Sequence, residues 1–387
     1  MKAILVLLHC SSNTGYAIGP LERTFYEMGL QLCDGDPRRV HFAYLSMAPG
    51  PSTTLPAEFG NYLELDTRST DAAHVGAACD YVRRHGIDTL FGFDQPVDLP
   101  AYAPLRRAGI RHFISYWGSS MSSLNPWPIL LLKRLQVALL RQGPDHYIFE
   151  SHGMARTAVQ GRGVARRRTS VVPLGVDTDY FAPATVRSDY LQQALGIPAH
   201  RKVFFYSGHM EPRKGVAVIM QAANLLAEQR EQDDWHVLLV GNKADQHLPW
   251  QALLTPAAAG HVTFGGYRDD IPQLQGQCHA AMIVSTGWDS FPRSGMECQS
   301  SGLPLLVSNL PGLNEAVEPG VTGYRLPVGD AQALATALVQ LLEDPVLRDR
   351  LGAAARQRIV ERYSLQIQQQ RLADIVRAVG AGRQPPP

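Results

Sequence analysis

An alternation of short apolar runs with segments of helical periodicity continues along this chain and constrains its fold more than any other feature. Such alternation is typical of parallel βαβ units, because parallel strands need a crossover connection between them. We therefore predict an α/β protein built on parallel sheets. Its expected strands are residues 3–8, 40–46, 89–93, 112–116, 147–149 and 170–172 in the first half, and 203–206, 235–240, 262–264, 280–285 and 304–307 in the second.

The chain length predicts two domains, since 387 residues exceed what a single core usually organises. A turn-rich stretch at residues 179–189 is the expected linker. In the second half, apolar residues at helical spacing predict a helix after Gly215 and another over residues 331–342. A last long helix is expected over residues 365–379, followed by a tail, residues 384–387, that we expect to be disordered.

Composition excludes several classes of protein. The formal net charge of +1 argues against a nucleic-acid partner, which usually requires a large basic excess. The five cysteines have no metal-ligand spacing and suit a reducing compartment. Residues 3–8 are too short for a signal peptide, and no apolar run reaches the length of a membrane span. We therefore predict a cytoplasmic protein without a metal site.

Two segments carry the chemistry that the sequence predicts, residues 207–215 and residues 289–297. Each follows an apolar, strand-like run and opens a predicted helix. The first carries the adjacent cations Arg213 and Lys214, and the second places the carboxylates of Asp289 and Glu297 eight residues apart. Cations and helix N-termini hold phosphates, and carboxylates accept hydrogen bonds from hydroxyls. The two segments together predict a pocket for a nucleotide diphosphate joined to a sugar.

Further segments, in order, extend this pattern into a resemblance. They are residues 173–181, 301–304, 312–315 and 320–323, placed around the two segments described above. The set resembles the retaining glycosyltransferases of family four, also called glycosyl transferases group 1, which have the GT-B fold. The resemblance implies two Rossmann-like domains with parallel sheets facing across a cleft, and a C-terminal helix that crosses back to the N-terminal domain. It implies an acceptor-side domain at residues 1–182, completed by 364–387, and a donor-binding domain at residues 183–363.

The resemblance also implies roles for individual residues. Lys214, Arg213 and Asp289 would be catalytic, and Trp117 would contact the sugar or the acceptor. The donor would be a nucleotide-diphosphate sugar, with UDP or GDP favoured, and its transfer would proceed by front-face attack without a metal or other cofactor. The donor-binding residues would be Gly15, Gly208, His209, Tyr267, Ser290, Phe291, Arg293, Ser294 and Glu297.

Four departures from the family pattern leave alternatives open. His209 stands where Arg is usual, Asp289 where Glu is usual, and Pro292 where Gly is usual. Trp117 and its neighbours stand where the family often has a His. The first alternative is a non-catalytic GT-B subunit that binds nucleotide or glycan and supports a partner transferase. The second is a nucleotide-sugar epimerase, which the pairing of Asp289 with Glu297 disfavours.

The acceptor would be a carbohydrate, a small-molecule glycoside or a lipid-linked glycan. Residues 128–142 bear on this question, because they predict a helix with a broad apolar face and the cations Lys133, Arg134 and Arg141. One interpretation is a helix packed beneath the N-terminal domain. The other is an interfacial helix that makes peripheral contact with the inner face of a membrane.

Overall fold

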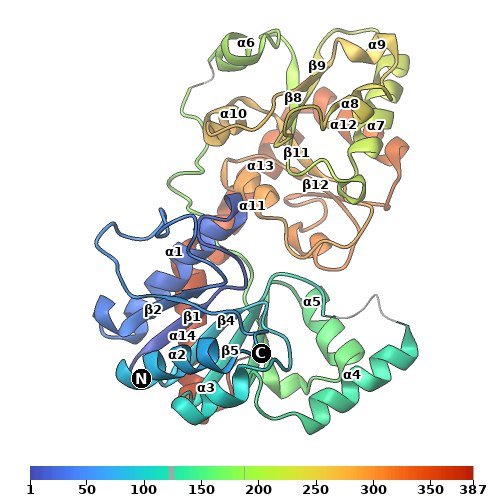
Figure 1. Cartoon of the computed structure of the whole chain (residues 1–387). Helices are drawn as coiled ribbons and strands as arrows, with labels where there is room; N and C mark the ends of the chain where they lie inside the picture. The colour runs from blue at the N-terminus through green and yellow to red at the C-terminus, as the bar shows by residue number, and fades with distance from the viewer. Residues whose placement is uncertain (122–125, 187, 387) are drawn as a thin grey trace. The chain divides into compact units, whose positions relative to one another are not determined.

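The computed structural model describes residues 1–121, 126–186 and 188–386, and it forms two compact units (Figure 1). Unit 1 comprises Met1–Pro173 with Gln366–Pro387, and unit 2 comprises Leu174–Leu365. Each unit contains one sheet whose strand pairs are all parallel. The predicted α/β class with two Rossmann-like halves is confirmed. The second unit begins at Leu174, upstream of the boundary expected between residues 182 and 183.

The sheet of unit 1 has the order β3-β2-β1-β4-β5-β6-β7. From β1 the chain adds β2 and β3 on one side, and then β4 to β7 on the other side, so the strand order reverses at β1. Ligands of doubly wound sheets bind beyond the carboxyl ends of strands near such a reversal. The strands are β1 (Ile4–Leu7), β2 (Val40–Tyr44), β3 (Tyr62–Glu64), β4 (Thr89–Phe93), β5 (His112–Trp117), β6 (His146–Phe149) and β7 (Thr169–Val171).

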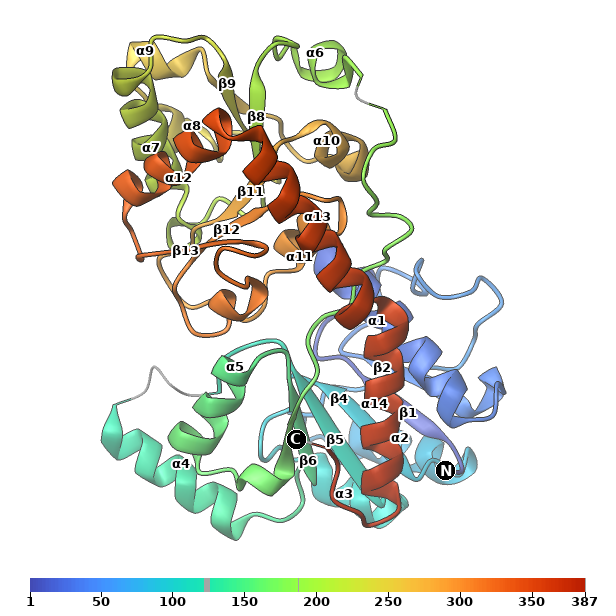
Figure 2. The same cartoon turned by 180° about the vertical axis from the view of Figure 1, so that it is seen from behind.

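Helices cover both faces of this sheet (Figures 1 and 2). Alternate residues of β1, Leu5 and Leu7, join a buried cluster with residues of α2 and α3, which lie over one face. The C-terminal helix α14 (Leu365–Gly380) packs in unit 1, where Gln368 Nε2 donates to the hydroxyl of Tyr116 at 3.3 Å. The other helices are α1 (Gly15–Leu32), α2 (Ala72–Arg84), α3 (Tyr102–Ala108), α4 (Trp127–Leu139) and α5 (His152–Arg156).

Unit 2 has a sheet in the order β10-β9-β8-β11-β12-β13. The adjacent central strands β8 and β11 precede the two segments that the sequence analysis selected, so both segments emerge side by side at one edge. The strands are β8 (Lys202–Ser207), β9 (Trp235–Val240), β10 (Val262–Phe264), β11 (Ala280–Ile283), β12 (Leu305–Ser308) and β13 (Gly323–Leu326). The helices are α6 (Tyr190–Leu195), α7 (Val216–Gln229), α8 (Leu248–Gln251), α9 (Pro256–Ala259), α10 (Ile271–Gln277), α11 (Arg293–Ser300), α12 (Ala331–Glu343) and α13 (Pro345–Arg362).

The predicted strands are all present, but the short strands β3 and β13 were not predicted. The prediction that residues 384–387 are disordered is wrong for part of that tail. Pro385 is buried, and the carbonyl of Pro386 accepts a hydrogen bond from Ser170 Oγ in β7. Residue 387 lies outside the described residues.

Candidate donor site and its relatives

The first segment of the predicted site is the turn between β8 and α7. Gly208 N–H donates to Val240 O at 3.1 Å, which ties this turn to the end of β9. The hydroxyl of Tyr206 donates to His209 O at 2.9 Å, while the His209 side chain is exposed. Burial raises the pKa of Tyr206, and the charge of Asp289 raises it further, so this hydroxyl stays protonated and keeps donating.

Gly215 brings the second segment against the first. Its φ is +78°, a left-handed conformation that favours glycine, and it caps the N-terminus of α7. A β-carbon at this position would lie only 1.9 Å from Val284 O, in the loop after β11. Any side chain would therefore separate the two loops that carry the candidate residues.

An ion pair joins the two segments. Lys214 Nζ lies 2.9 Å from Asp289 Oδ2, although 75 residues separate them in sequence. The same oxygen accepts from Ser285 Oγ at 2.8 Å, and the other carboxylate oxygen accepts from Ser290 N–H at 3.2 Å. Asp289 is only 7% exposed, so this carboxylate is held in one position by several donors. Two of the three predicted catalytic residues are thus in direct contact.

Arg213 makes a different set of contacts. Its Nε lies 2.9 Å from Glu211 Oε2, and its guanidinium stacks 4.5 Å from the ring centroid of Trp288. Its Nη1 also donates to Trp288 O at 3.1 Å, and its own carbonyl accepts from Thr286 N–H at 2.7 Å. Arg213 therefore shapes the loop between β11 and α11, in which Asp289 lies.

Among the helix N-termini at this edge, those of α7 and α11 lack a side-chain cap, as do those of α8 and α10, which follow β9 and β10. Neither α7 nor α11 has a capping side chain or an acidic residue in its first turn. By contrast, Asp330 caps α12 and Asp344 caps α13. Uncapped N–H groups and the positive end of the helix dipole attract an anion, which an Asp cap would repel. The edge that carries Lys214 is therefore suited to a phosphate group.

The remaining predicted residues of this segment lie on or next to α11. Arg293 and Ser294 form its first turn and are partly exposed. Ser290 and Glu297 are buried, at 8% and 4% exposure. Phe291 is also buried, with its ring 5.9 Å from that of Tyr363. Within residues 289–297, only Arg293 and Ser294, in the first turn of α11, are not buried.

A third turn, after β10, adjoins the first segment at the same edge. Gly241 N–H donates to Gly266 O at 2.8 Å, and Asn242 Oδ1 accepts from Gly266 N–H at 3.0 Å. The next residue, Tyr267, is 61% exposed. These contacts place the turn that contains the predicted donor-binding residue Tyr267 beside Gly208, because a β-carbon on Gly241 would lie 2.7 Å from Gly208 O.

Gly15 and Trp117 belong to unit 1 and lie at the carboxyl edge of its own sheet. Gly15 begins α1 with φ +63°, and the α1 N-terminus also lacks a side-chain cap. Trp117 is partly buried against a cluster that contains Val97 and Phe149, and its indole N–H donates to Gln95 O at 3.2 Å. Packing therefore occupies part of the Trp117 ring.

The structure reveals two further residues at this edge of unit 1. Asp94 follows β4 with φ +50°, unusual for a residue other than glycine, and its Oδ1 accepts from Gly118 N–H at 2.9 Å. Burial raises the pKa of Asp94 to about 6, although Gly118 N–H and the charge of His9 oppose the shift. From the sequence, Asp94 was predicted to be a solvated loop carboxylate, with contact to acceptor hydroxyls as the alternative, and His9 was not predicted as a site residue.

His9 follows β1 and is exposed. Its ring stacks on Phe93 at 5.4 Å, and its Nδ1 lies 3.2 Å from Phe93 O. A carbonyl oxygen only accepts, so Nδ1 carries the proton and, in the neutral ring, Nε2 is left as an acceptor. His9, Asp94 and Trp117 thus form a group of polar side chains at the ends of β1, β4 and β5.

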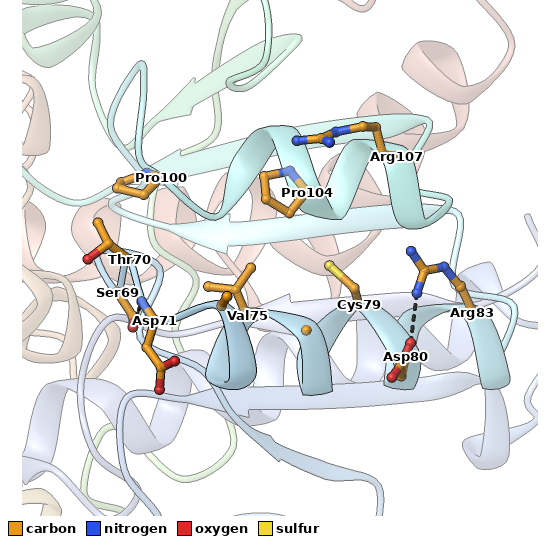
Figure 3. A pocket seen from close by; sticks show the side chains of 12 residues that line it. Ser69, Thr70, Asp71, Val75, Cys79, Asp80, Arg83, Pro100, Pro104 and Arg107 are labelled. Atoms are coloured by element: carbon orange, nitrogen blue, oxygen red, sulfur yellow. Dashed lines mark hydrogen bonds and ion pairs between the residues drawn. The ribbon is translucent and has the colours of Figure 1, made fainter.

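A groove between α2 and α3 is separate from these residues (Figure 3). It has a volume of about 510 Å³ and is lined by Val75, Cys79, Pro104 and Arg107, among others. Arg83 at its rim pairs with Asp80 at 2.7 Å. None of the predicted site residues lines it.

Comparisons with known proteins agree with this geometry. Residues 188–358 match the family model of glycosyl transferases group 1. An Escherichia coli UDP-Gal:alpha-D-GlcNAc-diphosphoundecaprenol alpha-1,3-galactosyltransferase is 28% identical over 209 residues, covering 51% of each chain. A phosphatidyl-myo-inositol mannosyltransferase of Mycolicibacterium smegmatis is 31% identical over 214 residues, covering 54% of this chain and 52% of its own. The chain thus spans about half the length of the curated relatives it matches.

Solved structures match over nearly the whole chain. A glycosyltransferase from Rickettsia africae aligns with a TM-score of 0.80 at 16% identity, covering 98% of this chain and 99% of its own. HepE from Anabaena, solved in complex with UDP, aligns with a TM-score of 0.78 at 19% identity, covering 97% and 100%. The fold and the paired strand-end loops therefore define a GT-B protein. Residues 188–358, which make up less than half of the chain, resemble the glycosyl transferases group 1 family.

Proposed function

We propose that this protein is a retaining glycosyltransferase that moves a hexose-type sugar from a nucleotide-diphosphate donor to a hydroxyl acceptor. The observation that carries the proposal is the Lys214–Asp289 pair, at 2.9 Å, between the uncapped N-termini of α7 and α11. This arrangement offers a cation and free N–H groups to a diphosphate, and a fixed carboxylate to the hydroxyls of a sugar.

Each residue has a role in this proposal. The ammonium of Lys214 has three N–H donors, so it can keep its contact with Asp289 and still donate to phosphate oxygens. The first turn of α11, at Arg293 and Ser294, receives the distal phosphate. Asp289 accepts from the transferred sugar, and Glu297 accepts from the ribose. As the bond to the anomeric carbon breaks, negative charge grows on the phosphate, and fixed positive groups stabilise that charge.

The chemistry needs no protein nucleophile in a front-face attack, because the leaving phosphate takes the proton of the attacking hydroxyl. We propose UDP or GDP as the nucleotide, supported by the UDP-sugar in the name of the Escherichia coli relative and the UDP in the Anabaena structure. No metal or other cofactor has a role in this mechanism. NMR of the product would test retention, since an inverted anomeric configuration contradicts it.

On the acceptor side, we propose that the polar group of unit 1 binds the acceptor. His9 Nε2 can accept from a hydroxyl, and the exposed part of Trp117 can stack against a sugar ring. The acceptor is a carbohydrate or a lipid-linked glycoside, which the lipid acceptors named for two relatives support. The reaction would then take place in the cytoplasm, at the inner face of the membrane.

The first experiment is a thermal-shift panel with UDP, GDP, ADP and dTDP and their common sugar conjugates. A nucleotide at a hundred times its dissociation constant adds about 2.7 kcal/mol of stability, which is an easily measured shift. A shift with one nucleotide supports the proposal and directs the search for an acceptor. Slow hydrolysis of the donor without acceptor would separate a transferase from a non-catalytic subunit, and the absence of any shift would contradict the donor site.

A further inference from the structure

Helix α4 (Trp127–Leu139) exposes apolar side chains that a helix of a soluble domain normally buries. It lies at the periphery of unit 1, away from the sheet, in both views (Figures 1 and 2). None of its residues is buried, so the interpretation that it packs beneath the domain is wrong. Its large exposed side chains are Trp127 (76%), Ile129 (43%), Leu131 (53%), Leu132 (58%), Leu135 (51%) and Leu139 (74%).

These side chains form a continuous surface. Trp127, Leu131, Leu135 and Leu139 recur every four residues, so they lie in one row along the helix. Among the described contacts, Val137 lies on the other side of the helix and packs against the cluster that contains Tyr147 and Phe149. There the Nε of Arg134 also donates to Gly161 O, at 3.2 Å. The apolar row therefore faces away from unit 1.

The segments around this row are rich in cations. Residues 126–144 and 151–168, which contain α4, α5 and the turns that follow them, include no Asp or Glu. In a chain of net charge +1, this is a strong local excess. Of the cations, Arg141, Arg156, Arg166 and Arg167 are exposed. They belong to a set that comprises Lys133, Arg134, Arg141, Arg156, Arg162, Arg166, Arg167 and Arg168.

We propose that α4 is an interfacial helix that docks unit 1 on a bilayer rich in anionic phospholipid. Its apolar row would lie among the acyl chains, with Trp127 at the headgroup level and the surrounding cations against the lipid phosphates. In the described part of the chain, no helix is long and apolar enough to cross a membrane. A second copy of the chain is a poorer occupant, because a two-fold contact would bring this basic region against itself.

The proposal rests on the lipid-linked acceptor suggested above, but it can be tested without donor or acceptor. Co-sedimentation with phosphatidylcholine vesicles, with and without phosphatidylglycerol, measures it directly. We expect binding that requires phosphatidylglycerol and weakens with salt. Each of Leu131→Ser, Leu135→Ser and Leu139→Ser should weaken binding about tenfold or more. Arg141→Gln should weaken it roughly fivefold.

Matched controls are the exposed leucines of unit 2, Leu248 and Leu253, at 51% and 46% exposure. Their serine variants should bind vesicles like the wild type. Brominated lipid should quench the fluorescence of Trp127, and Trp127→Phe should remove that quenching. If the proposed donor site is wrong, no nucleotide would raise the melting temperature in the thermal-shift panel. Vesicle binding would be unchanged by that result.

Equal binding to neutral vesicles, or binding that the leucine variants leave unchanged, would overturn the proposal. So would a wild-type dimer that the leucine variants dissociate, in the absence of vesicle binding, since that result assigns the row to a second copy. Because the substituted leucines are exposed, these variants should fold, and their unfolding curves should match that of the wild type.

Discussion

The carboxyl edges of the two sheets differ in charge, although both units share a parallel architecture. In unit 1, the loops after β1, β2, β4 and β5, at residues 8–14, 45–61, 94–101 and 118–121, contain no Lys or Arg. In unit 2, the loops after β8, β9 and β10 contain the cations Arg213, Lys214, Lys243 and Arg268, together with the carboxylates Glu211, Asp245, Asp269 and Asp270. One fold thus presents two kinds of edge. The unit 2 edge suits a phosphate, and the unit 1 edge suits uncharged hydroxyls.

The helix N-termini sharpen this comparison. In both units, the helices that begin at the candidate edges, α1, α7 and α11, lack side-chain caps. Only in unit 2 does a lysine stand beside such termini, with its charge balanced by Asp289. We expect backbone geometry to offer an anion site at both edges, and Lys214 to decide which of the two edges binds phosphate.

Removing the lysine should have the largest effect. We expect Lys214→Ala to lower turnover about 10²–10³-fold, because it removes a donor that stabilises the leaving phosphate. It also leaves Asp289 unpaired and buried, which should lower stability. The double variant Lys214→Ala with Asp289→Asn should recover stability but not turnover. Steady-state rates and urea unfolding measure both effects, with Lys202→Ala, at the opposite end of β8, as control. Near-normal turnover in Lys214→Ala would remove this residue from the mechanism.

The contact between the two loops of unit 2 predicts the next effect. Gly215→Ala should destabilise the protein by about 3 kcal/mol or more, since its β-carbon would lie 1.9 Å from Val284 O. Gly196 is the matched control, with φ +70° and nothing within 4 Å. Gly196→Ala should lower the free energy of unfolding by only the roughly 1–2 kcal/mol that a left-handed conformation costs a residue other than glycine. If Gly215→Ala and Gly196→Ala lose the same free energy of unfolding in urea, the close approach of the two loops does not affect stability.

These two sites also show what the sequence could and could not predict. The motif residues and the strands before them were predicted, because apolar runs and glycine turns are local signals. The Lys214–Asp289 contact was not, since it depends on β8 and β11 being neighbours in the sheet. Strands β3 and β13 were missed because a charged residue, Glu64 or Arg325, interrupts the apolar run on which the prediction depends.

The surface of α4 illustrates a different limit. Its apolar periodicity predicted a helix correctly, and the helix is present. Periodicity alone does not say whether an apolar face meets the core, a partner or a membrane. The position of the helix at the periphery of unit 1, which depends on the whole fold, resolved that choice against the core.

The unit 1 edge should have a pH dependence that comes from Asp94. Between about pH 4 and pH 6, folded Asp94 keeps a proton that the unfolded chain releases, because its pKa is raised from 3.8 to about 6. Its contribution to stability therefore falls as pH rises through that window. Asp94→Asn should be more stable than the wild type at pH 7 by on the order of 1–3 kcal/mol, and this gain should shrink toward pH 4.

Urea unfolding of the wild type and of Asp94→Asn across this pH range measures the difference between their free energies of unfolding. The contributions of the other titrating groups cancel in that difference. The exposed neighbour Asp98 supplies the control variant, Asp98→Asn, for which we expect no such trend. A stability gain that is the same at pH 4 and pH 7 would contradict the proton held by Asp94.

The smallest expected effect concerns the uncapped terminus of α11, where stability and ligand binding should change in opposite directions. Ser294→Asp adds a carboxylate to the first turn and should stabilise the helix by about 0.3–1 kcal/mol through the dipole. The same charge would stand where the distal phosphate binds, so nucleotide affinity should fall. In α12, already capped by Asp330, the control Gln332→Asp should change stability alone. If Ser294→Asp leaves affinity unchanged while it raises the melting temperature, the phosphate does not bind at α11, and the missing cap has no functional meaning.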